Sequence, residues 1–370
     1  MTRGFPTYEA ERALEEARAE GIEPVRLAGT PSPALPDHVV EAVAGVLRRP
    51  MTAPPSRGLA GLRDALAGEL RRSTGRAVDA DAEILVTNGA MHALALCFRS
   101  FVRPGDEVVV PAPCFFFEGP IRAAGATPVY VHGTASDGWR WDPEALEAAF
   151  GARTRVLLLC NPGNPTGHVP GHREVTDAVR VAERRGVLVV TDEAYEAALW
   201  DGATLTSAFG VTDDVVVVRS LGKSLALPQL RLGIVSGPSA RVSECARALE
   251  WECLRVDLAA QTAALAVLEG SREWLGDVHG GLVADRAAAL AAVEATPGLL
   301  AAVPAAAPFL FVHAASGEAV ADALARVGVP VVDGVHFQAP GYARLPFGGA
   351  ARAKTELVAA LARWATGSAH

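Results

Sequence analysis

Short, unbroken runs of valine, leucine and isoleucine recur along this chain, and segments with helical spacing separate them. VLLLC at residues 156–160, VLVVT at 187–191 and VVVVR at 215–219 are three of these runs. Apolar runs that do not alternate with polar residues are typical of strands buried on both faces of a sheet. Strands that alternate with helices indicate βαβ units. The pattern therefore predicts an α/β fold built on a mostly parallel sheet.

The pattern changes in the last third of the chain. Helical stretches over residues 240–268 and 282–295 lead to the short strands FLFVH and VPVV and to a final helix. A chain of 370 residues is long enough to form two domains. We predict a large domain over residues 40–245 and a smaller α+β domain formed by residues 1–39 with 246–370.

Charge and cysteine usage limit the partners and the compartment. The formal net charge is −8 and no dense basic run occurs, so we do not expect a nucleic-acid partner. The five cysteines are scattered and form no C-x-x-C motif, which suits a reducing cytoplasm with most thiols buried. The N-terminus shows no signal peptide, and no apolar run is long enough to span a membrane. We therefore expect a cytoplasmic protein without a membrane partner.

Polar residues directly follow four of the predicted strands. In an open parallel sheet, ligands bind beyond the carboxyl ends of the strands. Each feature alone is also compatible with a turn, a helix N-cap or a solvated charge, but their combination favours a shared site. The residues are Asn88 and Gly89 after EILVT, the loop NPGNPTG after RVLLLC, Asp192 after VLVVT, and Ser220 and Lys223 after VVVVR.

The motifs NPGNPTG, DEAY and SLGK, followed by Arg231, resemble the signature of fold-type I pyridoxal 5'-phosphate (PLP) enzymes. The nearest group is the class I and II aminotransferases, and the resemblance extends from LAGTPSP near Gly29 to GYARLPFG near Arg344. It implies PLP as cofactor, a seven-stranded, mostly parallel sheet in the large domain, and a smaller α+β domain. It also implies a homodimer with shared active sites.

The resemblance assigns the catalytic roles to Lys223, Asp192 and Tyr195. A PLP aldehyde is held as a Schiff base by a primary amine, and among side chains only lysine supplies one. This explains why the chain, which otherwise uses arginine for positive charge, keeps Lys223 as one of only two lysines beside Lys354. Asp192 would keep the ring nitrogen protonated, while Tyr195 and Asn164 would bond to the ring's phenolic oxygen.

The expected cofactor site also needs a phosphate pocket and a ring cover. Free N–H groups at the start of the helix after Gly89 favour an anion, and Ser220 and Arg231 would add a hydroxyl and a guanidinium. Phe115 would cover one face of the ring. The full set of expected cofactor-binding residues is Gly89, Ala90, Met91, Phe115, Asn164, Asp192, Tyr195, Ser220, Lys223 and Arg231.

The expected substrate site centres on Arg344, which matches the family's carboxylate-binding arginine; Gly29 and Asn164 would assist it. Ala53 stands where many relatives carry a tyrosine that reaches the partner subunit's phosphate site. Side-chain recognition by the partner is a hypothesis for the charged residues of EWECLRVDLAAQ, whose alternative is a solvated helix surface. Those charged residues are Glu252, Arg255 and Asp257.

The implied activity is transfer of the amino group of an α-amino acid to a 2-oxo acid. A lyase, cyclase or decarboxylase on the same fold would use the same residues and stays the alternative. A PLP-binding sensor module is a third possibility, disfavoured by the acidic charge. No metal site is expected, because Pro170 and Gly171 separate His168 from His172 and keep the two histidines off one helical face.

Overall fold

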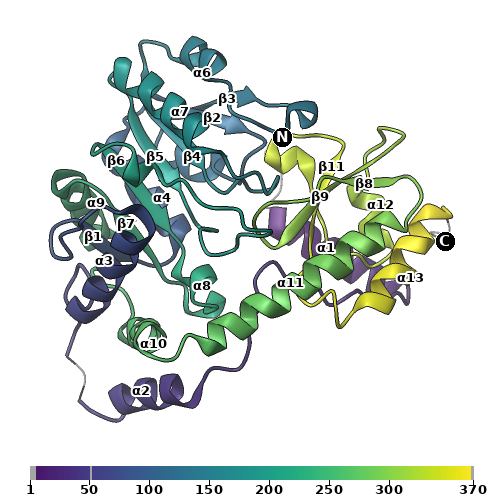
Figure 1. Ribbon diagram of the computed structural model, residues 1–370, viewed down its shortest axis with the longest axis horizontal. Coiled ribbons are helices and arrows are strands. Elements are labelled where there is room, and N and C mark those ends of the chain that lie inside the picture. Colours follow the sequence, from purple (N-terminus) through teal and green to yellow (C-terminus); the bar gives the residue numbers. More distant parts are fainter. Residues whose placement is uncertain (1–5, 51, 368–370) are drawn as a thin grey trace.

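The computed structural model describes residues 6–50 and 52–367 and shows two bodies of unequal size (Figure 1). The larger body contains a seven-stranded sheet in the order β1-β7-β6-β5-β4-β2-β3. All neighbouring strands pair in parallel except β7, which is antiparallel to both β1 and β6. The strands are β1 (Ile84–Thr87), β2 (Glu107–Ala112), β3 (Thr127–His132), β4 (Thr154–Cys160), β5 (Leu188–Asp192), β6 (Val215–Arg219) and β7 (Gly233–Ser236).

Helices enclose this sheet. Every residue of β1, β5, β6 and β7 is buried, so both faces of the central strands are covered, as their unbroken apolar runs predicted. The expected α/β fold with a mostly parallel sheet is therefore confirmed. The helices of this body are α2 (Asp37–Leu47), α3 (Ala60–Thr74), α4 (Ala90–Phe101), α5 (Glu118–Ala123), α6 (Pro143–Ala149), α7 (His172–Arg184), α8 (Leu221–Ser224), α9 (Ser239–Cys253) and α10 (Leu258–Glu269).

The smaller body is an antiparallel sheet with helices. Its order is β10-β11-β9-β8, and its core is separate from that of the larger body. Helix α11 runs between the two bodies (Figure 1). The elements are α1 (Pro6–Ala19), α11 (Glu273–Glu294), β8 (Leu299–Ala301), β9 (Phe309–Ala314), α12 (Ala321–Arg326), β10 (Val332–Asp333), β11 (Tyr342–Pro346) and α13 (Lys354–Ala365).

The helical stretch expected over residues 240–268 is two helices. The break lies between α9 and α10, where Leu254 adopts φ +61° and Asp257 caps α10 by accepting a hydrogen bond of 2.7 Å from the N–H of Ala260. Both helices contribute to the larger core, through side chains such as Leu249 and Ala260. We therefore propose that the change of domain lies after α10, later than the boundary at 245 drawn from the sequence.

Helices in the described parts of the chain lack the combined length and apolar character that a bilayer crossing requires. Four of the five cysteines are buried and Cys253 is half-buried, and all are free thiols. The expectation that most cysteines act as small buried residues is confirmed.

Candidate active site

The polar residues that follow β1, β4, β5 and β6 meet at one edge of the large sheet. These strands run in the same direction, because β7 between β1 and β6 is antiparallel to both. Cys160 at the end of β4 is level with Asp192, and Asp192 is level with Val218 of β6. The loop at 161–167, Asp192 and the helix that carries Lys223 therefore begin side by side.

Lys223 points among aromatic rings. It lies in the short helix α8, directly after β6, and is half-buried. Its Nζ lies 3.8 Å from the ring centre of the buried Tyr195 and 6.0 Å from that of Phe115. These are the three residues expected to form, tune and cover a bound PLP, and they share one space.

Asp192 is the last residue of β5 and is only 6 % exposed. Its Oδ1 accepts a hydrogen bond of 3.0 Å from the N–H of Ala194. Burial raises the pKa of Asp192, and the nearby positive charge of Lys223 lowers it. A buried carboxylate in this position gains from a cationic partner, which a protonated ring nitrogen would supply.

Gly89 and Arg231 form a cradle for an anion. Gly89 precedes α4 with φ +86°, a conformation that favours glycine. A Cβ on Gly89 would lie 3.0 Å from Nη2 of Arg231, so the guanidinium lies directly against this backbone. The first N–H groups of α4, which include those of Ala90 and Met91, have no partner within the helix. Guanidinium and helix N-terminus together suit a phosphate.

Ser220 stands at the start of α8 and is buried. Its carbonyl oxygen accepts hydrogen bonds from the N–H of Lys223 (3.0 Å) and from Oγ of Ser224 (3.2 Å). Ser220 and Lys223 therefore belong to the same helical turn, which follows the end of β6.

Arg344 is the positively charged residue that the smaller body contributes to the site. It projects from β11, and its Nη1 donates a hydrogen bond of 3.0 Å to Oδ1 of Asn164, which lies in the NPGNPTG loop of the other body. The guanidinium also lies 4.9 Å from the ring centre of Phe337 and 5.1 Å from that of Phe309. Burial lowers the pKa of Arg344. No carboxylate of the described residues forms an ion pair with Arg344, so its charge is free for a ligand.

Gly29 lies beside this arginine. A hollow of about 170 Å³ is lined by Gly29, Tyr195, Phe309 and Arg344, and the apolar segment 330–332, which leads into β10, forms part of its wall. Another hollow, of about 230 Å³, is lined by Cys160 and His168 but by none of the residues expected to bind the cofactor. The hollow at Arg344 therefore brings a guanidinium without a carboxylate partner together with Gly29 and Tyr195.

Several other sequence expectations fall outside this space. Glu252 forms an ion pair with Arg99 (2.6 Å), and its Oε2 lies 3.1 Å from Nε2 of His92; both partners belong to α4. Asp257 caps α10, and Ala53 is exposed. Within this chain these residues do not line the hollow at Arg344; a role in a partner's site stays a prediction.

Phe116 is half-buried and stacks on Phe115, with ring centres 4.5 Å apart, whereas Phe117 is fully buried. Sequence reasoning gave no role to Glu193 or Arg219, nor to the helix α11. Glu193 and Arg219 form a buried ion pair beside Asp192, where a charged residue at the end of an all-valine run was the available signal. Residues of α11 wall a cavity of about 320 Å³ that Lys223 and Tyr195 also line.

Comparison with known proteins decides the family. The sequence model described as "Aminotransferase class I and II" matches residues 28–361. The chain belongs to this family. It is 32% identical over 361 residues to the aspartate/prephenate aminotransferase of Thermus thermophilus, covering 95% of this chain and 92% of that one. It is also 32% identical to an aspartate aminotransferase of Streptomyces avermitilis, over 86% of this chain and 83% of that protein.

Solved structures agree with the sequence relatives. The aspartate aminotransferase from Thermus thermophilus with maleate superposes with a TM-score of 0.91 at 28% identity, over 98% of this chain and 97% of that one. As a class I and II aminotransferase, the chain is a PLP-dependent enzyme that acts on an amino acid and a 2-oxo acid. The anion cradle at Gly89, the buried carboxyl group of Asp192 and the primary amine of Lys223 fit the chemistry of that cofactor.

Proposed function

We propose that this aminotransferase works at the edge of the large sheet, with Lys223 as the covalent anchor and proton carrier and Arg344 as the binding group for the substrate α-carboxylate. The observation that carries the proposal is that the amine of Lys223 lies near the buried carboxyl group of Asp192 and over the ring of Tyr195, which also lines the hollow at the carboxylate-free guanidinium of Arg344. PLP, when bound, supplies an aldehyde that takes up amines and a ring that stores the electron pair of a broken bond.

The residues of the chain divide the remaining work. The cradle of Gly89 and Arg231 binds the phosphate and fixes the cofactor along the sheet edge. Asp192 would hold a proton at the ring nitrogen, and Tyr195, whose ring lies beside the Lys223 amine, would bond to the ring's phenolic oxygen. Lys223 would hold and move the proton of the substrate α-carbon, because its primary amine lies in this space.

The proposed amino donor is L-aspartate. Relatives that match most of the chain are named aspartate or aspartate/prephenate aminotransferases, and one of the solved structures that superpose on the chain has maleate, a four-carbon dicarboxylate. Arg344 and its bond to Asn164 support binding of the α-carboxylate, which every α-amino acid carries.

A half-reaction without acceptor tests the proposal. The holoenzyme is mixed with each amino acid in turn, and the 2-oxo acid and the ammonia released are measured against the enzyme concentration. Transfer predicts one equivalent of 2-oxo acid and no ammonia, with aspartate among the fastest donors. Repeated turnover with release of ammonia would instead identify an elimination enzyme and contradict the proposal.

We also propose that the enzyme is a cytoplasmic homodimer. Large apolar side chains are exposed on α2 and at the end of α9, and exposed apolar patches mark sites of protein association. They support a second copy of this chain that buries them. The side chains are Val40 (51 % exposed), Leu47 (56 %), Trp251 (91 %) and Leu254 (65 %). Sedimentation equilibrium tests this: a mass of one chain at working concentration would contradict it.

A further inference from the structure

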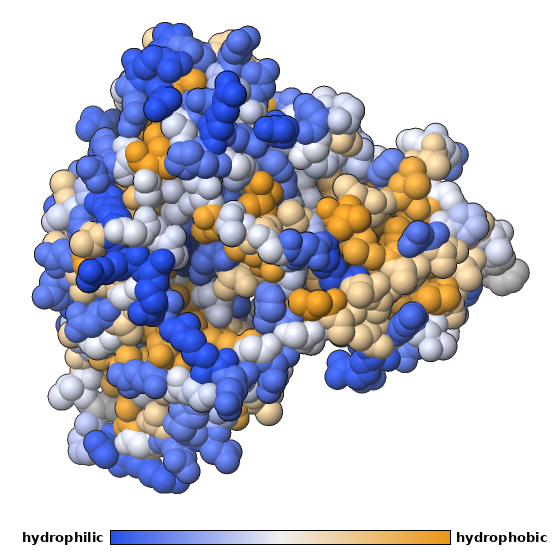
Figure 2. Space-filling view, viewed as in Figure 1, coloured by the Kyte–Doolittle hydropathy of each residue, from blue (hydrophilic) through white to orange (hydrophobic). Residues whose placement is uncertain are grey.

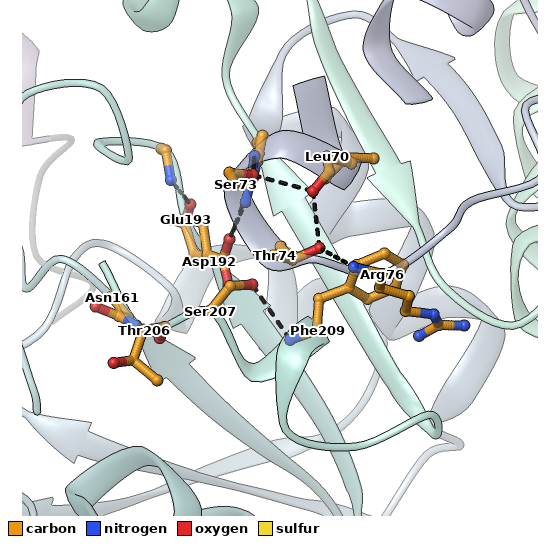
Figure 3. Close-up of polar contacts among 12 residues, drawn as sticks. Leu70, Ser73, Thr74, Arg76, Asn161, Asp192, Glu193, Thr206, Ser207 and Phe209 are labelled. Atoms are coloured by element: carbon orange, nitrogen blue, oxygen red, sulfur yellow. Dashed lines mark hydrogen bonds and ion pairs between the residues drawn. The ribbon is translucent and has the colours of Figure 1, made fainter. Parts of the chain in front are cut away.

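The ion pair between Glu193 and Arg219 is the most deeply buried one among the described residues. The Glu193 side chain is fully buried and that of Arg219 is 6 % exposed. Both Nε (3.1 Å) and Nη2 (2.8 Å) of Arg219 donate to Oε2 of Glu193. Figure 3 shows Glu193 beside Asp192, with Ser73 and Ser207 in the same group of polar contacts.

Each end of the pair is also held by a hydroxyl. Oγ of Ser207 donates to Oε1 of Glu193 at 2.6 Å, and Nη1 of Arg219 donates to Oγ of Ser73 at 3.2 Å. Four segments therefore meet at this pair: the ends of β5 and β6, which carry it, α3 through Ser73, and the loop before β6 through Ser207.

Stability alone does not explain such a pair. Removing two charges from water costs about as much as their attraction returns, and a well-packed apolar pair of the same volume is often as stable. The position in the chain offers another reason. Glu193 directly follows Asp192, and Arg219 stands four residues before Lys223.

The pair lies where the backbone ladder between β5 and β6 stops. The last level pair of this ladder is Asp192 with Val218, and the N–H of Glu193 donates to the carbonyl oxygen of Val218 at 2.8 Å. Beyond this point the two segments are joined by the side chains of Glu193 and Arg219 instead of by backbone hydrogen bonds. The ion pair thus extends the connection between the strands to the point where the active-site residues begin.

We propose that Glu193 and Arg219 are positioning residues that set the spacing between the carboxylate of Asp192 and the amine of Lys223. This inference rests on the proposed function, because the spacing matters only if the two groups act on one cofactor. A displacement of about 1 Å in such a site costs up to roughly a hundredfold in rate.

The test compares an apolar replacement of the pair with the wild type. The double variant Glu193→Met with Arg219→Met removes both charges together and roughly keeps the volume, so neither member of the pair is left buried without the other. The absorbance of bound PLP is titrated with pH, and kcat, KM and the melting temperature are measured. We expect a folded variant whose chromophore pKa shifts by about one unit and whose kcat falls about tenfold or more, with KM changed less than about threefold.

A folded double variant with the chromophore pKa and kcat of the wild type would overturn the proposal. If the double variant does not fold, Arg219→Lys keeps the charge but loses the two-pronged contact, and it is judged by the same chromophore shift. The matched control is Glu147→Gln, which breaks a surface ion pair with Arg184 (2.8 Å) and leaves the chromophore unchanged. The pH titration of bound PLP needs no turnover, so it reports on positioning even if the proposed amino transfer fails.

Discussion

Lys223 is the residue on which the chemistry depends. Replacement by arginine keeps a positive charge but removes the primary amine, so we expect Lys223→Arg to lose at least about a thousandfold in kcat. Amino transfer with aspartate and borohydride trapping of PLP on the protein measure the loss. Lys354→Arg is the control, because this exposed residue is the only other lysine, and it should keep full activity.

Arg344 carries the substrate carboxylate in the proposed function. Lysine at this position keeps the charge but lacks the fork that holds a carboxylate and Asn164 at once. We expect Arg344→Lys to raise KM for the amino acid by about ten- to a hundredfold and to leave PLP binding unchanged. The exposed Arg352→Lys serves as control. An unchanged KM for Arg344→Lys would show that the carboxylate binds elsewhere.

Glu196 is expected to make the stability of the folded protein depend on pH. Burial raises its pKa from about 4.5 to about 7, against the lowering effect of Arg219. The folded protein therefore binds a proton that the unfolded chain has lost, and this contribution to stability disappears as the pH rises from 4.5 to 7. Glu196→Gln stays neutral, so we expect its melting temperature to exceed that of wild type by roughly 1–3 °C at pH 8, and by less at pH 5. Glu318→Gln, at an exposed position, should change neither.

At the scale of elements, close packing between Gly89 and Gly233 of β7 positions the start of α4. A Cβ on Gly233 of β7 would lie 2.6 Å from the backbone carbon of Gly89, so the strand and the helix start are packed without room for a side chain. Gly89→Ala would meet Arg231 and require an unfavourable φ. We expect it to weaken PLP binding about tenfold or more, measured by fluorescence titration.

Gly105→Ala is the control that distinguishes the cost of an unfavourable backbone conformation from the loss of the anion cradle at Gly89 and Arg231. Gly105 also has a positive φ, +92°, but a Cβ there would meet nothing within 4 Å. This variant should lose stability to a similar degree and keep its affinity for PLP. Equal affinities for both variants would contradict the assignment of Gly89 to the phosphate.

Sequence patterns predicted the central strands of the large sheet but missed the break between α9 and α10. Unbroken valine and leucine runs identified the central strands β4, β5 and β6, because burial on both faces favours that composition, whereas the edge strand β3 (TPVYVH) is only partly buried. The break at Leu254 was missed, since neither glycine nor proline marks the turn. Only the capping residue Asp257 signalled a new helix.

The candidate site divides in the same way. The positions of Lys223, Asp192 and Asn164 followed from their strands, because parallel strands bring their ends to one edge. The pairing of Glu193 with Arg219 could not be predicted, because it depends on which neighbours lie level across β5 and β6 and on the burial of both charges.

At the scale of the whole molecule, the exposed apolar surface predicts assembly. Replacing Trp251 and Leu254 together by glutamate places two charges where the proposed partner packs, so we expect the dimer to dissociate and activity to fall. Analytical ultracentrifugation measures the mass, and Val303→Glu, at a residue 66 % exposed on the smaller body, is the matched control. A double variant that keeps the mass of two chains would move the interface elsewhere.

Helix α11 has a mechanical consequence. Its first turns wall the cavity next to Lys223, and its last turns carry Ala289 and Val293 in the core of the smaller body. Its 22 residues form one rod of about 33 Å. A tilt of the smaller body that brings Arg344 toward a ligand therefore also moves the first turns of α11. Binding of the substrate carboxylate and the volume of the cavity beside Lys223 then change together.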